Sequence, residues 1–109
     1  METLTRIADV GPDMGERAAE AAALLKTLAN HNRLMIVCTL VEGEQSVGQL
    51  EDLLGIHQPT LSQQLTVLRE AGIIAARRDA KHVFYRLAED KAARLVTALY
   101  EIFCGEGAK

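Results

Sequence analysis

Two helical stripes on either side of Gly55 dominate residues 47–72 of this 109-residue chain. Apolar side chains recur at the three- and four-residue spacing of one helix face, first at Val47, Leu50 and Leu54 and then at Leu61, Leu65 and Leu68. Pro59 stands where the second helix would begin. A short glycine-containing break before a proline-initiated helix is typical of a helix-turn-helix.

The outward face of the second helix carries uncharged hydrogen-bonding groups. An ordinary solvated face would carry Lys and Glu, whereas Gln, Ser and Thr can bind base edges in the major groove of DNA. At about 100° per residue, Gln63 and Thr66 lie opposite the leucines. A helical hairpin with a polar outer face is the alternative. We expect DNA contacts from Gln58, Thr60, Ser62, Gln63 and Thr66.

The pattern changes from helix to strand after Gly72. Residues 73–78 and 82–87 alternate with a period of two around a turn at 79–81, and Val83, Tyr85 and Leu87 fall on one face. The sequence therefore predicts a mainly α protein with a two-stranded β-hairpin wing, a winged helix-turn-helix. The side chains of the hairpin expected to reach phosphate or the minor groove are Arg77, Arg78, Lys81 and His82.

Charge is distributed as a DNA-binding chain requires, although the net charge is −3. Residues 56–87 hold five basic and two acidic residues, which gives +3. Residues 1–30, 31–55 and 88–109 are each net negative. Positive charge is thus concentrated beside the polar helix face, where phosphate contacts would need it.

The segments around this unit are expected to be helical and to belong to the same domain. We expect residues 1–13 to form a flexible N-terminal tail and residues 14–109 to form a single winged-helix DNA-binding domain. The expected helices and caps are, in order, a helix over 15–28, an Asn30 cap on a helix over 31–42, a capping box of Ser46 with Gln49, and a last helix over 89–104 ended by Gly105.

The first and last helices carry more apolar surface than the core of so small a domain can absorb. Packing them against their two-fold copies in a homodimer would bury the excess. The residues expected to make this dimer contact are Ala22, Leu25, Leu95, Val96, Leu99 and Ile102.

Several other classes of protein are disfavoured. The apolar run Ala21–Leu25 is far shorter than the ~18 residues of a membrane span, and no basic-then-apolar leader precedes it, so we expect a cytoplasmic protein without a membrane partner. His31, His57 and His82 have no partner at ligand spacing, so we expect neither a metal site nor a cofactor. The sequence contains no nucleophile–base pair, no CxxC motif and no Gly-rich phosphate loop, so we do not expect an enzyme.

The order helix, helix, helix-turn-helix, wing, helix resembles the ArsR/SmtB family of bacterial winged-helix repressors. Three segments carry the resemblance: LKTLANHNRLMIVCTL, SVGQLEDLLGIHQPTLSQQLTVLREAGII and RRDAKHVFYRL. Within the family, the chain resembles the BigR/SqrR-like branch. Members of that branch carry one Cys on the second helix and one at the end of the last helix, and Cys38 and Cys104 occupy these two positions. His31 departs from the family, which usually has Pro there. The resemblance implies a homodimeric repressor that an inducer releases from its operator, in this branch a persulfide or related sulfur species.

Cys38 and Cys104 are the candidate redox-sensing pair. From the residues alone, a small core hydrophobe is the favoured role of Cys38, whereas no core packing obviously requires Cys104 beside Gly105. A helix C-terminus disfavours a thiolate, so we expect Cys38 to attack first, provided that a cation or a local opening lowers its pKa. A general thiol-oxidation sensor, a metal- or As(III)-responsive repressor, a constitutive DNA binder and a thiol oxidoreductase are the alternatives.

Overall fold

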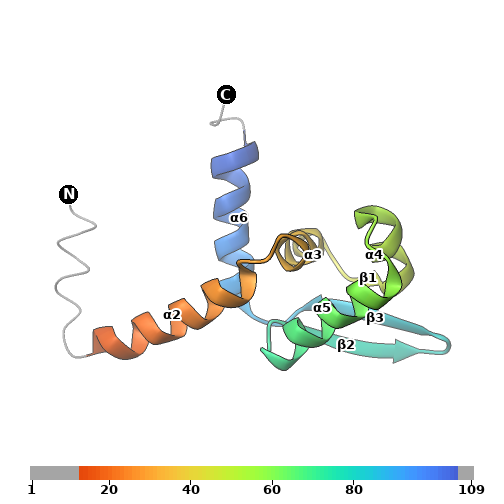
Figure 1. Ribbon diagram of the computed structural model, residues 1–109, viewed down its shortest axis with the longest axis horizontal. Coiled ribbons are helices and arrows are strands. Elements are labelled where there is room, and N and C mark those ends of the chain that lie inside the picture. The colour runs from red at the N-terminus through yellow and green to blue at the C-terminus, as the bar shows by residue number, and fades with distance from the viewer. Residues whose placement is uncertain (1–12, 106–109) are drawn as a thin grey trace.

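The computed structural model describes residues 13–105, so the expected N-terminal tail lies outside the described residues except for Asp13. The helices and the β-hairpin follow one another in the expected order, and most bounds agree with the sequence analysis to within one residue (Figure 1). The elements are α2 (Met14–Leu28), α3 (His31–Val41), β1 (Gln45–Ser46), α4 (Val47–Leu54), α5 (Gln58–Glu70), β2 (Ile74–Asp79), β3 (His82–Leu87) and α6 (Asp90–Cys104).

The helix-turn-helix forms for the local reasons that the sequence indicated. The Ser46 side chain accepts a hydrogen bond from the backbone N–H of Gln49, and the Gln49 side chain accepts one from the Ser46 N–H, which completes the capping box of α4. Gly55 ends α4 in the left-handed region at φ 67°, where glycine is favoured. Pro59 lies in the first turn of α5, where its missing N–H costs no helical bond.

The wing belongs to a three-stranded antiparallel sheet of order β1-β3-β2. The β2–β3 hairpin pairs Asp79 with His82 across the tip, where Ala80 has φ 57°. The two-stranded sheet expected from the sequence therefore gains a third strand, because Gln45 and Ser46 pair with Tyr85 and Phe84. Two residues are too few to show an alternating pattern.

The core lies where α3, α5, the sheet and α6 meet. The expected Leu50, Leu61, Leu65 and Leu68 are all at most 2% exposed. On α3 the three- and four-residue spacing predicts one buried face with Leu34, Val37, Cys38 and Val41. That prediction is partly wrong, because Val41 is 40% exposed while Ile36 and Leu40 are buried. The buried α3 residues are Ile36, Val37 and Leu40, with Leu34 and Cys38 packed against the cluster.

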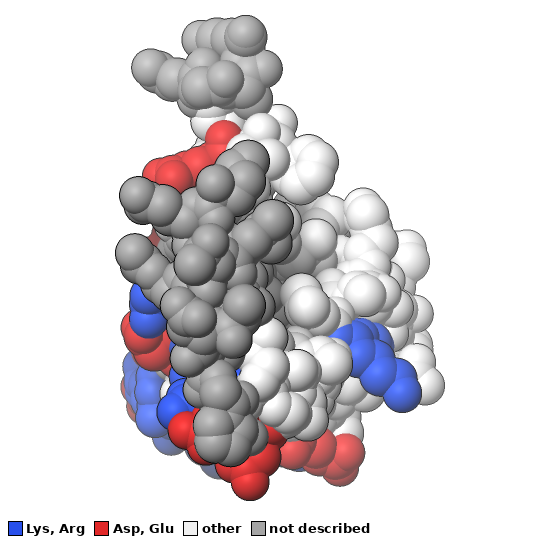
Figure 2. All heavy atoms as spheres, turned by 90° about the vertical axis from the view of Figure 1, so that its left-hand side faces the viewer, with Lys and Arg blue, Asp and Glu red and all other residues white. Residues whose placement is uncertain are grey.

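The outer helices project from this body (Figure 1). In α2 the only buried residue is Leu28, and in α6 only Ala92 and Val96 are buried. The two helices are joined by an ion pair between Glu20 and Lys91. Seen from the α2 side, a broad, mostly uncharged surface on the right contrasts with charged side chains along the left and lower edges (Figure 2). Among the described residues, no helix is long and apolar enough to cross a membrane.

Candidate functional site

The outer face of α5 presents the polar side chains that the sequence analysis selected. Gln58, Thr60, Ser62, Gln63 and Thr66 are all exposed, while the leucines of the same helix are buried. The Ser62 hydroxyl donates to Gln58 Oε1 at 3.0 Å, and the Thr66 hydroxyl donates to the Ser62 carbonyl at 2.9 Å. Within residues 13–105, no hydrogen bond engages the Gln63 side chain, so its amide is available to a ligand.

A neighbouring glutamine has a different role that the sequence analysis missed. Gln64 is half-buried, and its Oε1 accepts a hydrogen bond from Arg33 Nη1 at 2.8 Å. Arg33 lies in the first turn of α3 and also donates from Nε to the carbonyl of Thr27, at 2.6 Å. The partners of Arg33 are 6 and 31 residues away in the chain, so no local pattern could have indicated this contact.

The wing divides the expected basic residues into two groups. Arg78, Lys81 and His82 are exposed and extend from the hairpin tip. Arg77 instead donates from Nε and Nη2 to the two carboxylate oxygens of Glu44, at 2.9 and 2.7 Å. Its guanidinium also lies 4.6 Å from the centroid of the Phe84 ring.

The Arg77 guanidinium, by hydrogen bonding and by charge, lowers the pKa of Glu44, and the same bond raises the pKa of Arg77. A bidentate arginine–carboxylate pair of this geometry holds both partners in place. Arg77 is therefore tied to the loop before β1, and a phosphate contact by its guanidinium would compete with Glu44. No sequence pattern paired Glu44 with it.

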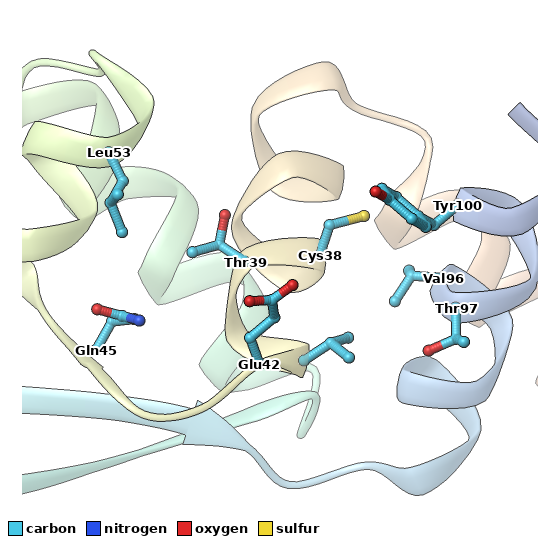
Figure 3. A pocket seen from close by; sticks show the side chains of 9 residues that line it. Cys38, Thr39, Glu42, Gln45, Leu53, Val96, Thr97 and Tyr100 are labelled. Atoms are coloured by element: carbon cyan, nitrogen blue, oxygen red, sulfur yellow. The ribbon is translucent and has the colours of Figure 1, made fainter. Parts of the chain in front are cut away.

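Cys38 and Cys104 are both free thiols, one half-buried and the other exposed. Cys38 borders a groove of about 490 Å³ between α3, α4 and α6, and its sulfur points toward Tyr100 of α6 (Figure 3). Cys104 is the last residue of α6. The backbone after it leaves no room for a side chain at Gly105, because a Cβ there would lie 2.7 Å from the Glu101 carbonyl oxygen. The residues lining the groove are Cys38, Thr39, Val41, Glu42, Gln45, Leu53, Val96, Thr97 and Tyr100.

The electrostatic surroundings of Cys38 do not activate it. Burial is the main cause that raises the pKa of the Cys38 thiol, and charge on Cys104 raises it further. Glu42 is the charged residue of the groove lining, so the cation that the expectation of first attack by Cys38 required is absent from it. In residues 13–105, no group of three or more His, Cys, Asp and Glu could hold a metal ion.

The candidate dimer surface needs one reassignment. Leu25 is 52% and Ile102 63% exposed, and Ala22 is exposed as well. Leu95 and Leu99 are half-buried in their own chain. Val96 is 1% exposed and belongs to the protomer core, so it has no surface to offer a partner. The expected contact residues did not include two strongly exposed aromatic side chains of α6, Tyr100 at 59% and Phe103 at 75%.

Comparison with known proteins gives consistent matches. Residues 30–76 match the model of the family described as bacterial regulatory protein, arsR family. The chain is similar to the biofilm growth-associated repressor of Agrobacterium fabrum (strain C58), with 69% identity over 93 residues, or 85% of this chain and 80% of the relative.

Two solved structures extend the similarity to the fold. The crystal structure of the transcriptional repressor BigR from Xylella fastidiosa has a TM-score of 0.81 at 67% identity, covering 84% of this chain and 94% of that one. A solution structure of a homodimeric winged helix-turn-helix domain, Mb0332 from Mycobacterium bovis, has a TM-score of 0.70 at 31% identity and covers 93% of both chains. The expected winged helix-turn-helix is thereby confirmed.

Proposed function

This chain belongs to the arsR family of bacterial regulatory proteins, and we propose that it is a cytoplasmic, homodimeric repressor that releases its operator when Cys38 and Cys104 become cross-linked. The observation that carries the DNA-binding part is the exposed, uncharged polar face of α5 beside a basic wing. The observation that carries the regulatory part is the placement of two free thiols on helices that pack against each other, Cys38 on α3 and Cys104 at the end of α6.

The geometry of α5 supports a DNA contact. Its leucines fix one face against the core, which leaves Thr60, Gln63 and Thr66 directed outward. A 13-residue helix is about 20 Å long at 1.5 Å per residue and fits the major groove, where Gln can bind adenine with two hydrogen bonds. Arg78 and Lys81 on the wing would contact phosphate, which positions the helix without reading sequence.

Dimerisation is supported by the apolar surface of the outer helices. Leu25, Tyr100, Ile102 and Phe103 are each more than half exposed in the single chain. The names of the similar proteins include two repressors and one homodimeric winged helix-turn-helix. A two-fold dimer would place its two recognition helices in successive major grooves about 34 Å apart.

The inducer proposed for the thiol pair is a persulfide, R–S–SH. Cys104 is exposed and meets the reagent first. Its thiolate attacks the sulfane sulfur and expels RS⁻, which leaves Cys104 as a persulfide. The Cys38 thiolate then attacks the cysteine sulfur of that persulfide, forming the Cys38–Cys104 disulfide and expelling HS⁻. The two cysteines are oxidised and the sulfane sulfur is reduced to sulfide; each further sulfur retained in the bridge requires one further persulfide.

A bridge would connect helices with different tasks. Cys38 lies on α3, which packs against α5, whereas Cys104 ends the proposed dimer helix α6. Tying them together would change the tilt of the recognition helices relative to the two-fold axis. Because both half-sites must be matched at once, a small shift suffices for a coupling of about 1–3 kcal/mol.

DNA selection tests the repressor part of this proposal. The purified chain is used to select its preferred duplex from a randomised library, and its affinity is compared with that for a scrambled duplex of the same composition. We expect one dimer per selected duplex and at least about a thousandfold preference, the lower end of specific binding. Equal affinity for both duplexes would reject the sequence-specific repressor.

A further inference from the structure

One arginine joins three helices of this chain. The Arg33 guanidinium, in the first turn of α3, donates to the Thr27 carbonyl in the last turn of α2 and to Gln64 Oε1 in the middle of α5, at 2.6 and 2.8 Å. Its backbone N–H donates to the Asn30 side chain at 3.0 Å. This bond caps α3 and fixes the backbone from which the Arg33 side chain extends. Both guanidinium bonds are partly shielded from solvent.

The chemistry of this contact makes it stiffer than an ordinary surface hydrogen bond. Carbonyls of a last helical turn have no helical partner and lie at the negative end of the helix dipole, so the charge of Arg33 is favourable at Thr27. The guanidinium donates in a fixed planar fork and stays charged at any physiological pH. It therefore holds the end of α2 and the side chain of Gln64 in one arrangement.

The position of Gln64 gives this contact a consequence for DNA reading. Gln64 directly follows Gln63, the proposed base reader, and precedes the buried Leu65. On the other side, Leu28 is the only buried residue of α2, so α2 has few other attachments to the body of the protomer. Arg33 thus connects α2, which carries part of the proposed dimer surface, to the recognition helix α5 through two hydrogen bonds.

We propose that Arg33 and Gln64 form a positioning pair that sets the orientation of α5 relative to α2, and so adjusts the recognition helices to the half-site spacing. This inference rests on the proposed function. The pair acts through Gln63 and its neighbours and does not itself touch the bases. A competing explanation is that Gln64 contacts DNA directly, in which case its effect would not depend on Arg33.

A double-mutant cycle distinguishes these explanations. The full chain is compared with Gln64→Met, which keeps the side-chain length but removes the acceptor, with Arg33→Lys, which keeps the charge but loses the fork, and with both together. Affinity is measured for the duplex selected by the wild type and for the scrambled duplex, and thermal unfolding is recorded for each variant. Gln64→Glu is the matched rescue variant, because its carboxylate can still accept from Arg33.

We expect each single variant to lower the ratio of selected to scrambled affinity at least about fivefold, the lower end of typical site–site coupling. The double variant should lower it no further than the larger single effect. Gln64→Glu should weaken both duplexes through its added charge but keep the wild-type ratio.

The positioning pair would be overturned if the double variant lowered the affinity ratio by the product of the two single effects. It would also be overturned if affinity for both duplexes fell equally, in proportion to a lowered melting temperature. An unchanged ratio in Gln64→Met would overturn it too. A wild-type chain without preference for any duplex would instead reject the proposed function itself, so the two failures are distinguishable.

Discussion

Individual residues in this chain take their roles from neighbours that are distant in sequence. Arg77 and Arg78 are adjacent and chemically identical, yet Glu44 engages only Arg77. Cys38 and Cys104 are both free thiols, yet burial raises the pKa of Cys38 while Cys104 is exposed. At this scale the type of residue indicates what chemistry is available, and the tertiary contact decides whether it is used.

The two cysteines should differ in reactivity. We expect iodoacetamide to alkylate Cys104 well before Cys38 at about neutral pH. Alkylation needs an accessible thiolate, and Cys38 is half-buried with a raised pKa. The part of this preference that comes from the raised pKa of Cys38 should shrink as the pH rises through that pKa, whereas the part that comes from its partial burial should remain. Peptide mass mapping over time measures both rates; Cys38 labelled first would contradict the assignment of Cys104 as the entry point.

The two wing arginines should differ in salt dependence. Arg78→Ala should reduce the slope of log affinity against log salt by about 1.8 per dimer, because each protomer loses one phosphate contact worth about 0.9 on duplex DNA. Arg77→Ala should leave the slope nearly unchanged, because Glu44 already engages that guanidinium. Titrations of the scrambled duplex at several salt concentrations test this. Equal slope changes in the two variants would show that DNA displaces Glu44 from Arg77.

At the scale of elements, the sequence predicts what is encoded locally. The helix-turn-helix could be read from Gly55, Pro59 and the leucine spacing, and the capping box from Ser46 and Gln49, because each signal lies within one or two helical turns. Strand β1 could not be predicted, since its two residues are strand only through pairing with β3.

The candidate site also contains features that local sequence patterns predict and features that they do not. The polar face of α5 follows from helical periodicity alone, and all five expected residues are exposed. The Arg33–Gln64 and Arg77–Glu44 contacts join residues 31 and 33 positions apart and leave no local pattern. The burial of Val96 was also missed, because a wide apolar stripe on α6 does not show which part the protomer core covers.

The polar face of α5 should carry sequence discrimination. Gln63→Ala should weaken binding to the selected duplex by about 1–3 kcal/mol for each half-site of the dimer, the discrimination of one good bidentate base contact, and should change scrambled-duplex affinity little. Equilibrium binding to both duplexes measures the difference, with Glu70→Gln at the far end of the same helix as the matched control. A similar loss on both duplexes would make Gln63 a backbone contact.

At the scale of the whole molecule, the unusual feature is apolar surface that one protomer leaves uncovered. Tyr100, Ile102 and Phe103 occupy the last two turns of α6, and all are more than half exposed. Fully burying an Ile or Phe side chain contributes about 1.5–3 kcal/mol, and a two-fold dimer would count each residue twice. A homodimer is the assembly that this surface fits.

Charge introduced into that surface should separate the protomers. Phe103→Asp should shift the chain from dimer to monomer in sedimentation at micromolar concentration, because dimerisation would bury an unpaired carboxylate. Its helical content should stay unchanged, since Phe103 is 75% exposed in the single chain. Ala80→Asp adds the same charge at the wing tip and should leave the dimer intact. A wild type that sediments as a monomer would remove the dimer from the account.

The central claim is that cross-linking Cys38 to Cys104 releases DNA, and one titration tests it most directly. The dimer bound to its selected duplex is treated with increasing glutathione persulfide, and the bound fraction and the intact-mass fraction of bridged chains are measured on the same samples. We predict that release rises in proportion to bridging, and that Cys38→Ser and Cys104→Ser remain bound at every dose. Release by either single variant, or full bridging with the duplex still bound, would contradict the account.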